Sequence, residues 1–127
     1  MARKSSKRAV GKTVGVEALL EQAAGKLAGC RALKRGVILV RVTGAGAEPA
    51  DYWFDCAEKG ARLVREAPRP EASPTIEIIG DARNISGVLT GQKNALKHFL
   101  AGGFRVRGDL RYFSDLALEM GILTNPL

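Results

Sequence analysis

Residues 89–109, LTGQKNALKHFLAGGFRVRGD, carry the pattern that decides the fold. The apolar helix that enters this stretch ends at Gly91, because glycine suits the left-handed position after a helix. A second short helix follows over residues 94–101, and Gly102-Gly103 breaks it. Residues 104–108 then alternate between apolar and basic side chains, which is the period of a strand. The stretch therefore predicts two short helices and a strand, and it contains no motif of catalytic residues.

Helix-capping residues mark where the neighbouring elements begin. Asp81 is a good N-cap for a helix over residues 82–90, and Asn94 can cap the second short helix. Asp109 precedes a last helix over residues 110–120, whose apolar residues recur at three and four positions. The predicted order of elements in the C-terminal half is therefore strand, short helix, short helix, strand and helix.

The N-terminal half predicts one helix and most of a sheet. An amphipathic helix is expected over residues 16–29, and strands are expected over residues 37–42, 52–58, 61–66 and 75–79. Turns at residues 44–49 and 58–60 join the first three strands, which predicts an antiparallel meander. Together with the C-terminal half this gives four helices and five strands, an α+β fold.

The length and composition are those of one globular domain. The chain has 127 residues, of which 46% are hydrophobic and 26% charged. No apolar run approaches the roughly 18 residues of a membrane span, and the start lacks the apolar core of a secretory signal. A cytoplasmic location is the expectation, although the basic, acid-free start leaves a mitochondrial presequence open.

The net charge of +7 is concentrated at the N-terminus. No acidic residue precedes Glu17, and the other 15 basic and 13 acidic residues give only +2. We expect residues 1–14 to form a flexible tail and residues 15–127 to form the domain. Such a tail can contact anionic membrane lipids through its basic residues, which are Arg3, Lys4, Lys7, Arg8 and Lys12.

The pattern around residues 89–109 resembles the sterol-carrier-protein-2-like family of lipid-binding domains. The matching positions are Leu89-x-Gly91 and Phe99-x-x-Gly102-x-Phe104-x-Val106-x-Gly108-Asp109, preceded by Thr75-Ile76-Glu77-Ile78 running into Gly80-Asp81. The resemblance extends more weakly back to about Val16. It implies a mostly antiparallel five-stranded sheet, covered on one face by helices that enclose an apolar tunnel for a sterol, fatty acid or fatty acyl-CoA.

The resemblance implies non-enzymatic lipid binding or transfer, with apolar side chains as the site. The candidate lining consists of Leu89, Leu96, Phe99, Leu100, Phe113, Leu116 and Met120, opposed by Trp53, Ile76 and Ile78. Periodicity alone favours a core filled by the same residues, and the resemblance reverses that preference. Arg105 and Arg107 share a strand face, and this pattern favours a solvated face of the sheet. Together with Arg111 they are also candidates for contact with an anionic headgroup or a CoA phosphate.

The residues that support catalysis or metal binding are sparse. His98 is the only histidine, and it is expected on the polar side of its helix. Cys30 and Cys56 match no metal or redox spacing and lie in apolar contexts, which favours buried free thiols. We therefore expect no enzyme, no metal site and no cofactor.

Two other classes of function stay open from the sequence. A protein-interaction or accessory module would have the same fold with a closed core, and the uncharged C-terminal segment, residues 121–127, could dock on a partner or on its own domain. A nucleic-acid binder would use the basic tail, but the body has no basic surface helix and no strand that pairs aromatic residues with lysines. Nucleic acid is therefore the less favoured partner, and a homodimer stays open.

Overall fold

The computed structural model describes residues 11–44, 47–58, 60–68 and 73–127. The elements, in chain order, are α2 (Gly11–Ala28), β1 (Gly36–Gly44), β2 (Ala47–Ala57), β3 (Gly60–Val64), β4 (Ile76–Asp81), α3 (Ala82–Leu89), α4 (Ala95–Leu100), β5 (Phe104–Gly108) and α5 (Leu110–Glu119). The α+β class is confirmed. The helix α2 begins five residues earlier than predicted, and most of the basic tail, residues 1–10, lies outside the described residues.

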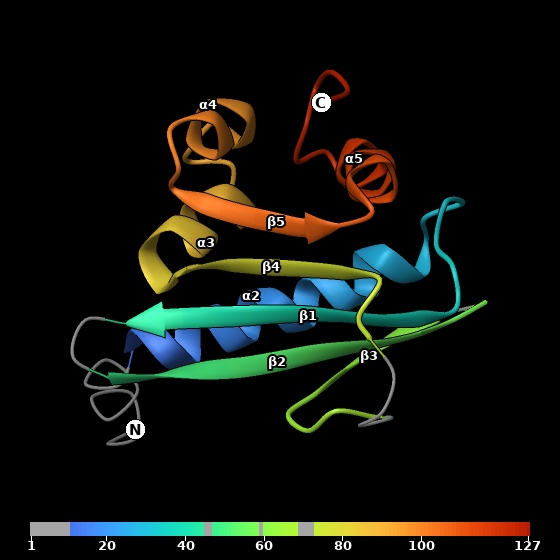
Figure 1. Ribbon diagram of the computed structural model, residues 1–127, viewed down its shortest axis with the longest axis horizontal. Coiled ribbons are helices and arrows are strands. Elements are labelled where there is room, and N and C mark those ends of the chain that lie inside the picture. Colours follow the sequence, from blue (N-terminus) through green and yellow to red (C-terminus); the bar gives the residue numbers. More distant parts are fainter. Residues whose placement is uncertain (1–10, 45–46, 59, 69–72) are drawn as a thin grey trace, which may run out of the picture.

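The five strands form one sheet in the order β3-β2-β1-β4-β5 (Figure 1). The pairs β1–β2 and β2–β3 are antiparallel, as the predicted meander requires; β4–β5 is also antiparallel, and β1–β4 is parallel. The chain therefore returns from the edge strand β3, past β2 and β1, to enter β4 beside β1. This crossover brings the C-terminal half of the chain against the centre of the sheet.

The predicted caps are confirmed, and they explain where the C-terminal helices begin. The side-chain carboxylate of Asp81 accepts a hydrogen bond from the Asn84 N–H at 2.7 Å. The side chain of Asn94 accepts from Lys97 N–H at 2.9 Å in the same way. Asp109 also accepts from the N–H three residues later, at 2.9 Å, which starts α5. Each bond satisfies a backbone donor that the helix itself leaves without a partner.

The predicted turn at residues 44–49 is wrong in extent. The strand β2 already begins at Ala47, so residues 45–46 separate the two strands. The register shifts between Val42, which faces Ala50, and Gly44, which faces Ala47. Pro49 falls inside this irregularity, where a residue without an N–H costs no ladder hydrogen bond. A proline that indicates a turn in the sequence is here accommodated by a β-bulge.

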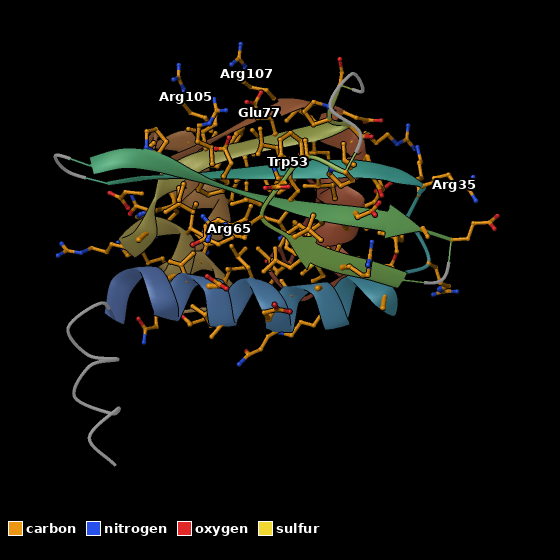
Figure 2. All side chains as sticks on the ribbon, turned by 90° about the horizontal axis from the view of Figure 1, so that it is seen from below. Arg35, Trp53, Arg65, Glu77, Arg105 and Arg107 are labelled. Atoms are coloured by element: carbon orange, nitrogen blue, oxygen red, sulfur yellow. The ribbon has the colours of Figure 1, made fainter. Side chains whose placement is uncertain are left out.

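One face of the sheet carries the main core. Its inward side chains alternate along the strands and pack against α2, α3 and α5; they include Ile38, Val40, Val42, Tyr52, Phe54, Cys56 and Ile76. Figure 2 shows α2 lying along this face, with Trp53, Glu77, Arg105 and Arg107 on the other side of the sheet. The covered face therefore holds the enclosed site, while the outer face carries charged side chains around Leu39, which is itself buried.

Two side chains of α5 fix the segment that follows α2. The carboxylate of Glu119 accepts hydrogen bonds from the backbone N–H groups of Arg31 and Ala32, both at 2.8 Å. These bonds stabilise the charged form and lower the pKa of Glu119. The hydroxyl of Tyr112 accepts from the Lys34 N–H at 2.7 Å. These hydrogen bonds attach α5 to the segment that follows α2. They complete the layer of helices over the sheet.

Candidate functional site

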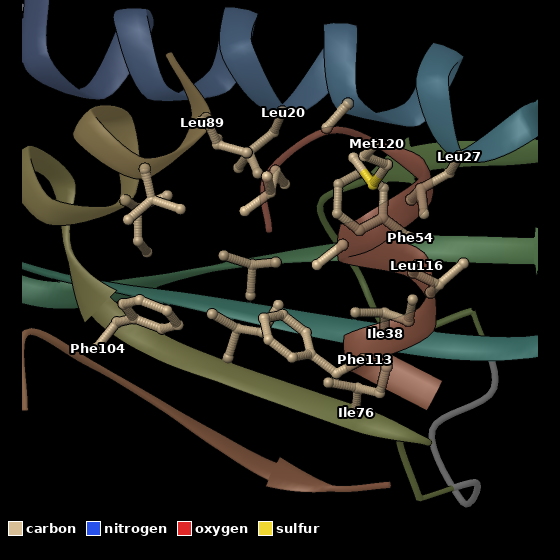
Figure 3. Close-up of a pocket in the computed structure, with 17 residues that line it drawn as sticks. Leu20, Leu27, Ile38, Phe54, Ile76, Leu89, Phe104, Phe113, Leu116 and Met120 are labelled. Atoms are coloured by element: carbon tan, nitrogen blue, oxygen red, sulfur yellow. The ribbon is translucent and has the colours of Figure 1, made fainter. Parts of the chain in front are cut away.

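An apolar cavity of about 90 Å³ lies between the helices and the covered face of the sheet (Figure 3). Every element except β3 and α4 contributes to its wall. The lining residues are Leu20, Ala23, Leu27, Ile38, Val40, Phe54, Ile76, Ile78, Ile85, Val88, Leu89, Phe104, Phe113, Leu116, Ala117, Met120 and Ile122. All of them are apolar, so the cavity favours hydrocarbon over water or a charged group.

Six residues predicted for the site line this cavity. Leu89 ends α3, while Phe113, Leu116 and Met120 come from α5 and the residue that follows it. From the sheet, Ile76 and Ile78 of β4 complete this set. The α5 residues recur at three and four positions, which places them on one helix face toward the sheet. Whether these six contact a ligand stays a prediction.

The residues predicted from α4 do not reach the cavity. Leu100 has 73% of its surface exposed. Leu96 packs in a separate small cluster with Ala95, Ala117 and Leu123, and the ring of Phe99 lies 5.7 Å from that of Phe104. The placement predicted for these three residues is therefore corrected. α4 has only six residues, and of its apolar positions Phe99 backs the wall through Phe104 whereas Leu100 faces solvent.

Trp53 lies on the wrong face of β2 for the cavity, which corrects a further predicted lining residue. It pairs with Leu39 of β1, and Leu39 pairs with Glu77 of β4. This row of side chains stands on the outer face of the sheet (Figure 2). Phe54, its neighbour, points inward and lines the cavity instead. The sequence contains a signal for this placement. Trp53 shares its strand face with Asp51 and Asp55, whereas over residues 50–56 the opposite face of β2 carries only apolar and aromatic side chains.

The arginines predicted for headgroup contact lie away from the cavity. Arg105 and Arg107 stand on the outer face, where Arg107 Nη1 is 3.9 Å from the carboxylate of Glu77. Arg111 is exposed in the first turn of α5. A strand directs successive side chains to opposite faces, so the basic residues of β5 must point away from Phe104, which lines the cavity. Arg105 and Arg107 therefore lie on the outer sheet face and not on the cavity wall, and their contact with an anionic headgroup stays a prediction.

α2 contributes more to the cavity than the sequence suggested. Leu20, Ala23 and Leu27 lie at three- and four-residue intervals and form one side of the wall. The amphipathic pattern of this helix predicted a buried face, but gave no reason to connect it with the site. The connection arises because α2 packs on β3 and α3 while α5 packs on β4, and both helices face the cavity, which Leu20 and Met120 line.

The polar groups of the described residues offer no catalytic centre at the cavity. Burial raises the pKa of the Cys56 thiol to about 11, with a smaller contribution from Asp55, so the thiol stays protonated at neutral pH. The Nε2 atom of His98 is 2.6 Å from the side-chain oxygen of Asn84, so this histidine joins α4 to α3. No group of three or more metal-ligating side chains occurs in the described part of the chain.

The size of the cavity limits what it holds in this conformation. Sites for drug-sized ligands usually measure about 300–1,000 Å³. A volume of about 90 Å³ is smaller than that of an engineered cavity of about 150 Å³ that admits benzene. An acyl chain would have to displace part of the wall. The most adaptable part is Met120, whose unbranched side chain has several rotamers.

Comparison with known proteins identifies the architecture. The profile of the SCP-2 sterol transfer family matches residues 16–117. The fold is similar to palmitated SCP2L2 from Aedes aegypti, with a TM-score of 0.63, 14% identity and coverage of 82% of this chain and 92% of that one. No curated protein sequence matches the chain at a significant level.

Two further solved structures share the fold at similarly low identity. For the apo form of sterol carrier protein 2 from Yarrowia lipolytica, the TM-score is 0.56 at 18% identity, with 84% of this chain and 77% of that chain covered. For sterol carrier protein domain 2 of Helicoverpa armigera, the TM-score is 0.60 at 15% identity, with 91% and 87% covered. None of the helices in the described part of the chain is long and apolar enough to cross a membrane.

Proposed function

We propose that this chain, which belongs to the SCP-2 sterol transfer family, binds an apolar lipid without catalysis and carries it between membranes. The observation that supports the proposal most directly is the cavity, because all of its lining residues are apolar and no catalytic group adjoins it. The ligand classes under this proposal are a sterol, a fatty acid or a fatty acyl-CoA. A cytoplasmic location belongs to the same proposal.

The driving force would be burial of hydrocarbon. Each methylene that leaves water for an apolar enclosure contributes about 0.8 kcal/mol. Part of that gain is spent on enlarging the cavity, since the present volume of about 90 Å³ does not hold an acyl chain. Opening would have to displace part of the wall that α2, α3 and α5 form over the sheet. The affinity for a fatty acid would then rise with the length of its acyl chain, until further methylenes no longer fit in the cavity.

The test is displacement of a fluorescent fatty acid from the purified full chain. We expect palmitate, palmitoyl-CoA or cholesterol to displace the probe at micromolar concentration. Affinity should rise as a series of saturated fatty acids lengthens, because each methylene adds buried apolar surface. If none of the three ligands displaces the probe, and an organic extract of the protein contains no lipid by mass spectrometry, lipid transfer is excluded.

The small cavity volume favours a second candidate, a protein-interaction module with a closed core. In that case the cavity is a packing defect, and none of the lipids above competes with the probe. Residues 121–127 pack in part on their own domain, since Leu123 is buried and the Leu127 N–H donates to the Ser114 hydroxyl at 3.1 Å. The Leu127 side chain, which is 42% exposed, is then the part of this segment that a partner would meet. The displacement experiment separates the two candidates directly.

The basic tail is proposed as a contact with anionic membrane lipids. Replacing Arg3, Lys4, Lys7 and Arg8 together with glutamine should weaken binding to vesicles that contain phosphatidylserine. Only the salt-sensitive part of the vesicle binding should be lost. That part comes from exposed charges, whose interactions are screened beyond about 10 Å at 0.1 M salt. Thermal stability should stay unchanged. Equal vesicle binding by the two proteins would show that the tail is not an anchor, and salt-dependent binding of duplex DNA would favour a nucleic-acid partner.

A further inference from the structure

Tyr52 is a buried tyrosine whose hydroxyl forms no hydrogen bond with the described residues. Its side chain is completely buried on the covered face of β2, and its hydroxyl has no hydrogen-bond partner among the described residues. Buried polar groups in folded proteins nearly always have a partner, so an exception calls for a reason. A bound ligand that supplies the missing partner is one such reason.

A second buried tyrosine of the chain provides the contrast. The hydroxyl of Tyr112 accepts a hydrogen bond from the Lys34 N–H at 2.7 Å and donates to the Lys34 carbonyl at 3.3 Å. Both tyrosines are at most 3% exposed and both belong to the main core. The fold therefore satisfies one hydroxyl fully and leaves the other without a protein partner.

Tyr52 stands beside the wall of the cavity. It pairs across the sheet with Val40, and Phe54 follows it at the next inward position of β2. Val40 and Phe54 both line the cavity. Since all lining residues are apolar, the polar end of a lipid finds no partner within the present cavity. An enlargement past Val40 and Phe54 would bring a ligand to Tyr52.

An arginine adjoins the same tyrosine. The guanidinium of Arg65 lies 4.3 Å from the centroid of the Tyr52 ring, and Figure 2 shows Arg65 between the sheet and α2. Its Nε donates to the Asp51 carbonyl at 3.2 Å. Its Nη1 is 3.8 Å from the carboxylate of Glu17, which is too long for a hydrogen bond. The Arg65 side chain is 53% exposed, and among the described residues its terminal nitrogens have only this long ion pair with Glu17, so a ligand carboxylate would compete with Glu17 for the terminal N–H groups.

We propose that Tyr52 and Arg65 form the polar anchor of the lipid site, binding the carboxylate of a fatty acid whose chain fills the enlarged cavity. A carboxylate only accepts hydrogen bonds, and the two side chains offer donors. The bond from the guanidinium would be charge-assisted and hence among the stronger ones. Burial raises the pKa of Tyr52, so the hydroxyl keeps its proton at neutral pH. This inference rests on the proposed lipid binding and narrows it to a carboxylic acid.

The experiment compares palmitate with methyl palmitate in the displacement assay on the full chain. The wild-type protein should bind the acid more tightly than the ester. Tyr52→Phe should weaken palmitate binding by about fivefold, the effect of losing one hydrogen bond. It should leave the melting temperature unchanged or higher, because the hydroxyl has no partner in the free protein. Arg65→Met should bring the affinities for the acid and the ester close to each other.

Tyr112→Phe is the matched control, since it removes a hydroxyl that already has protein partners. It should lower the melting temperature and leave the preference for the acid unchanged. If the wild type binds the acid and the ester equally, or if Tyr52→Phe and Arg65→Met keep wild-type palmitate affinity while folded, the anchor is wrong although lipid binding stands. Binding of neither lipid by the wild type overturns the proposed function and the anchor with it.

Discussion

Replacing Ala23 with phenylalanine is expected to reduce lipid affinity at least tenfold while the protein stays folded. Ala23 lies on the face of α2 that lines the cavity, and its side chain is 5% exposed. The ring would occupy space that the ligand needs. Because part of the ring enters the existing volume of about 90 Å³, the loss of stability should stay below the upper end of the roughly 1–3 kcal/mol that overpacking costs.

The control for this change is Ala18→Phe on the exposed side of the same helix. It adds the same ring to α2 without entering the cavity, so it should change neither the affinity nor the urea midpoint. Displacement of a fluorescent fatty acid and urea unfolding measure the two quantities for both variants. Ala23→Phe with wild-type affinity would show that lipid binds elsewhere. A loss of stability well above 3 kcal/mol would show that this part of the core has no room, as the closed interaction module requires.

Gly108→Ala should be the most destabilising single substitution considered, at about 3 kcal/mol or more from backbone strain plus steric clash. Gly108 has a φ of +99°, and an added Cβ would lie 2.4 Å from the Thr75 carbonyl oxygen. That oxygen also accepts from the Asp109 N–H at 3.1 Å, so it cannot move without weakening the hydrogen bond that ties the β5–α5 junction to the start of β4. Both the strain and the clash therefore remain in the folded state.

Gly91→Ala separates the two contributions. Gly91 has a φ of +80°, but an added Cβ meets no atom within 4 Å. Its cost should be only that of the left-handed backbone, roughly 1–2 kcal/mol. Urea unfolding of both variants gives the difference in the free energy of unfolding, which measures the clash at Gly108. Equal costs for the two substitutions would show that Thr75 yields easily and that the β5–α5 connection is not rigid.

The sequence predicted which helices have an apolar face better than it predicted what covers each face in the structure. Leu89, Leu116 and Met120 line the cavity, and each belongs to a helix or helix end with one apolar face. Leu100 was expected there for the same reason, yet it is exposed. Periodicity shows that a helix has an apolar face, but it does not show which neighbour covers that face. α4 is too short and lies too far out for its last turn to be covered.

The sequence by itself determined the order of the elements and most of their ends. Asp81, Asn94 and Asp109 start their helices, and Gly91 ends one in a left-handed conformation. These features depend on side chains and backbone groups only a few residues apart, so the pattern contains all the information that they need. The α+β class followed from this order.

Only the tertiary structure decided which faces look inward and what they enclose. In β2, Phe54 lines the cavity and Trp53 stands on the outer face, although both are large and aromatic. The cavity volume and the unpartnered hydroxyl of Tyr52 appear only when α2, β1 and α5 are packed together. The physical reason is that burial, cavity volume and hydrogen-bond satisfaction depend on contacts between residues far apart in the chain, which no local pattern specifies.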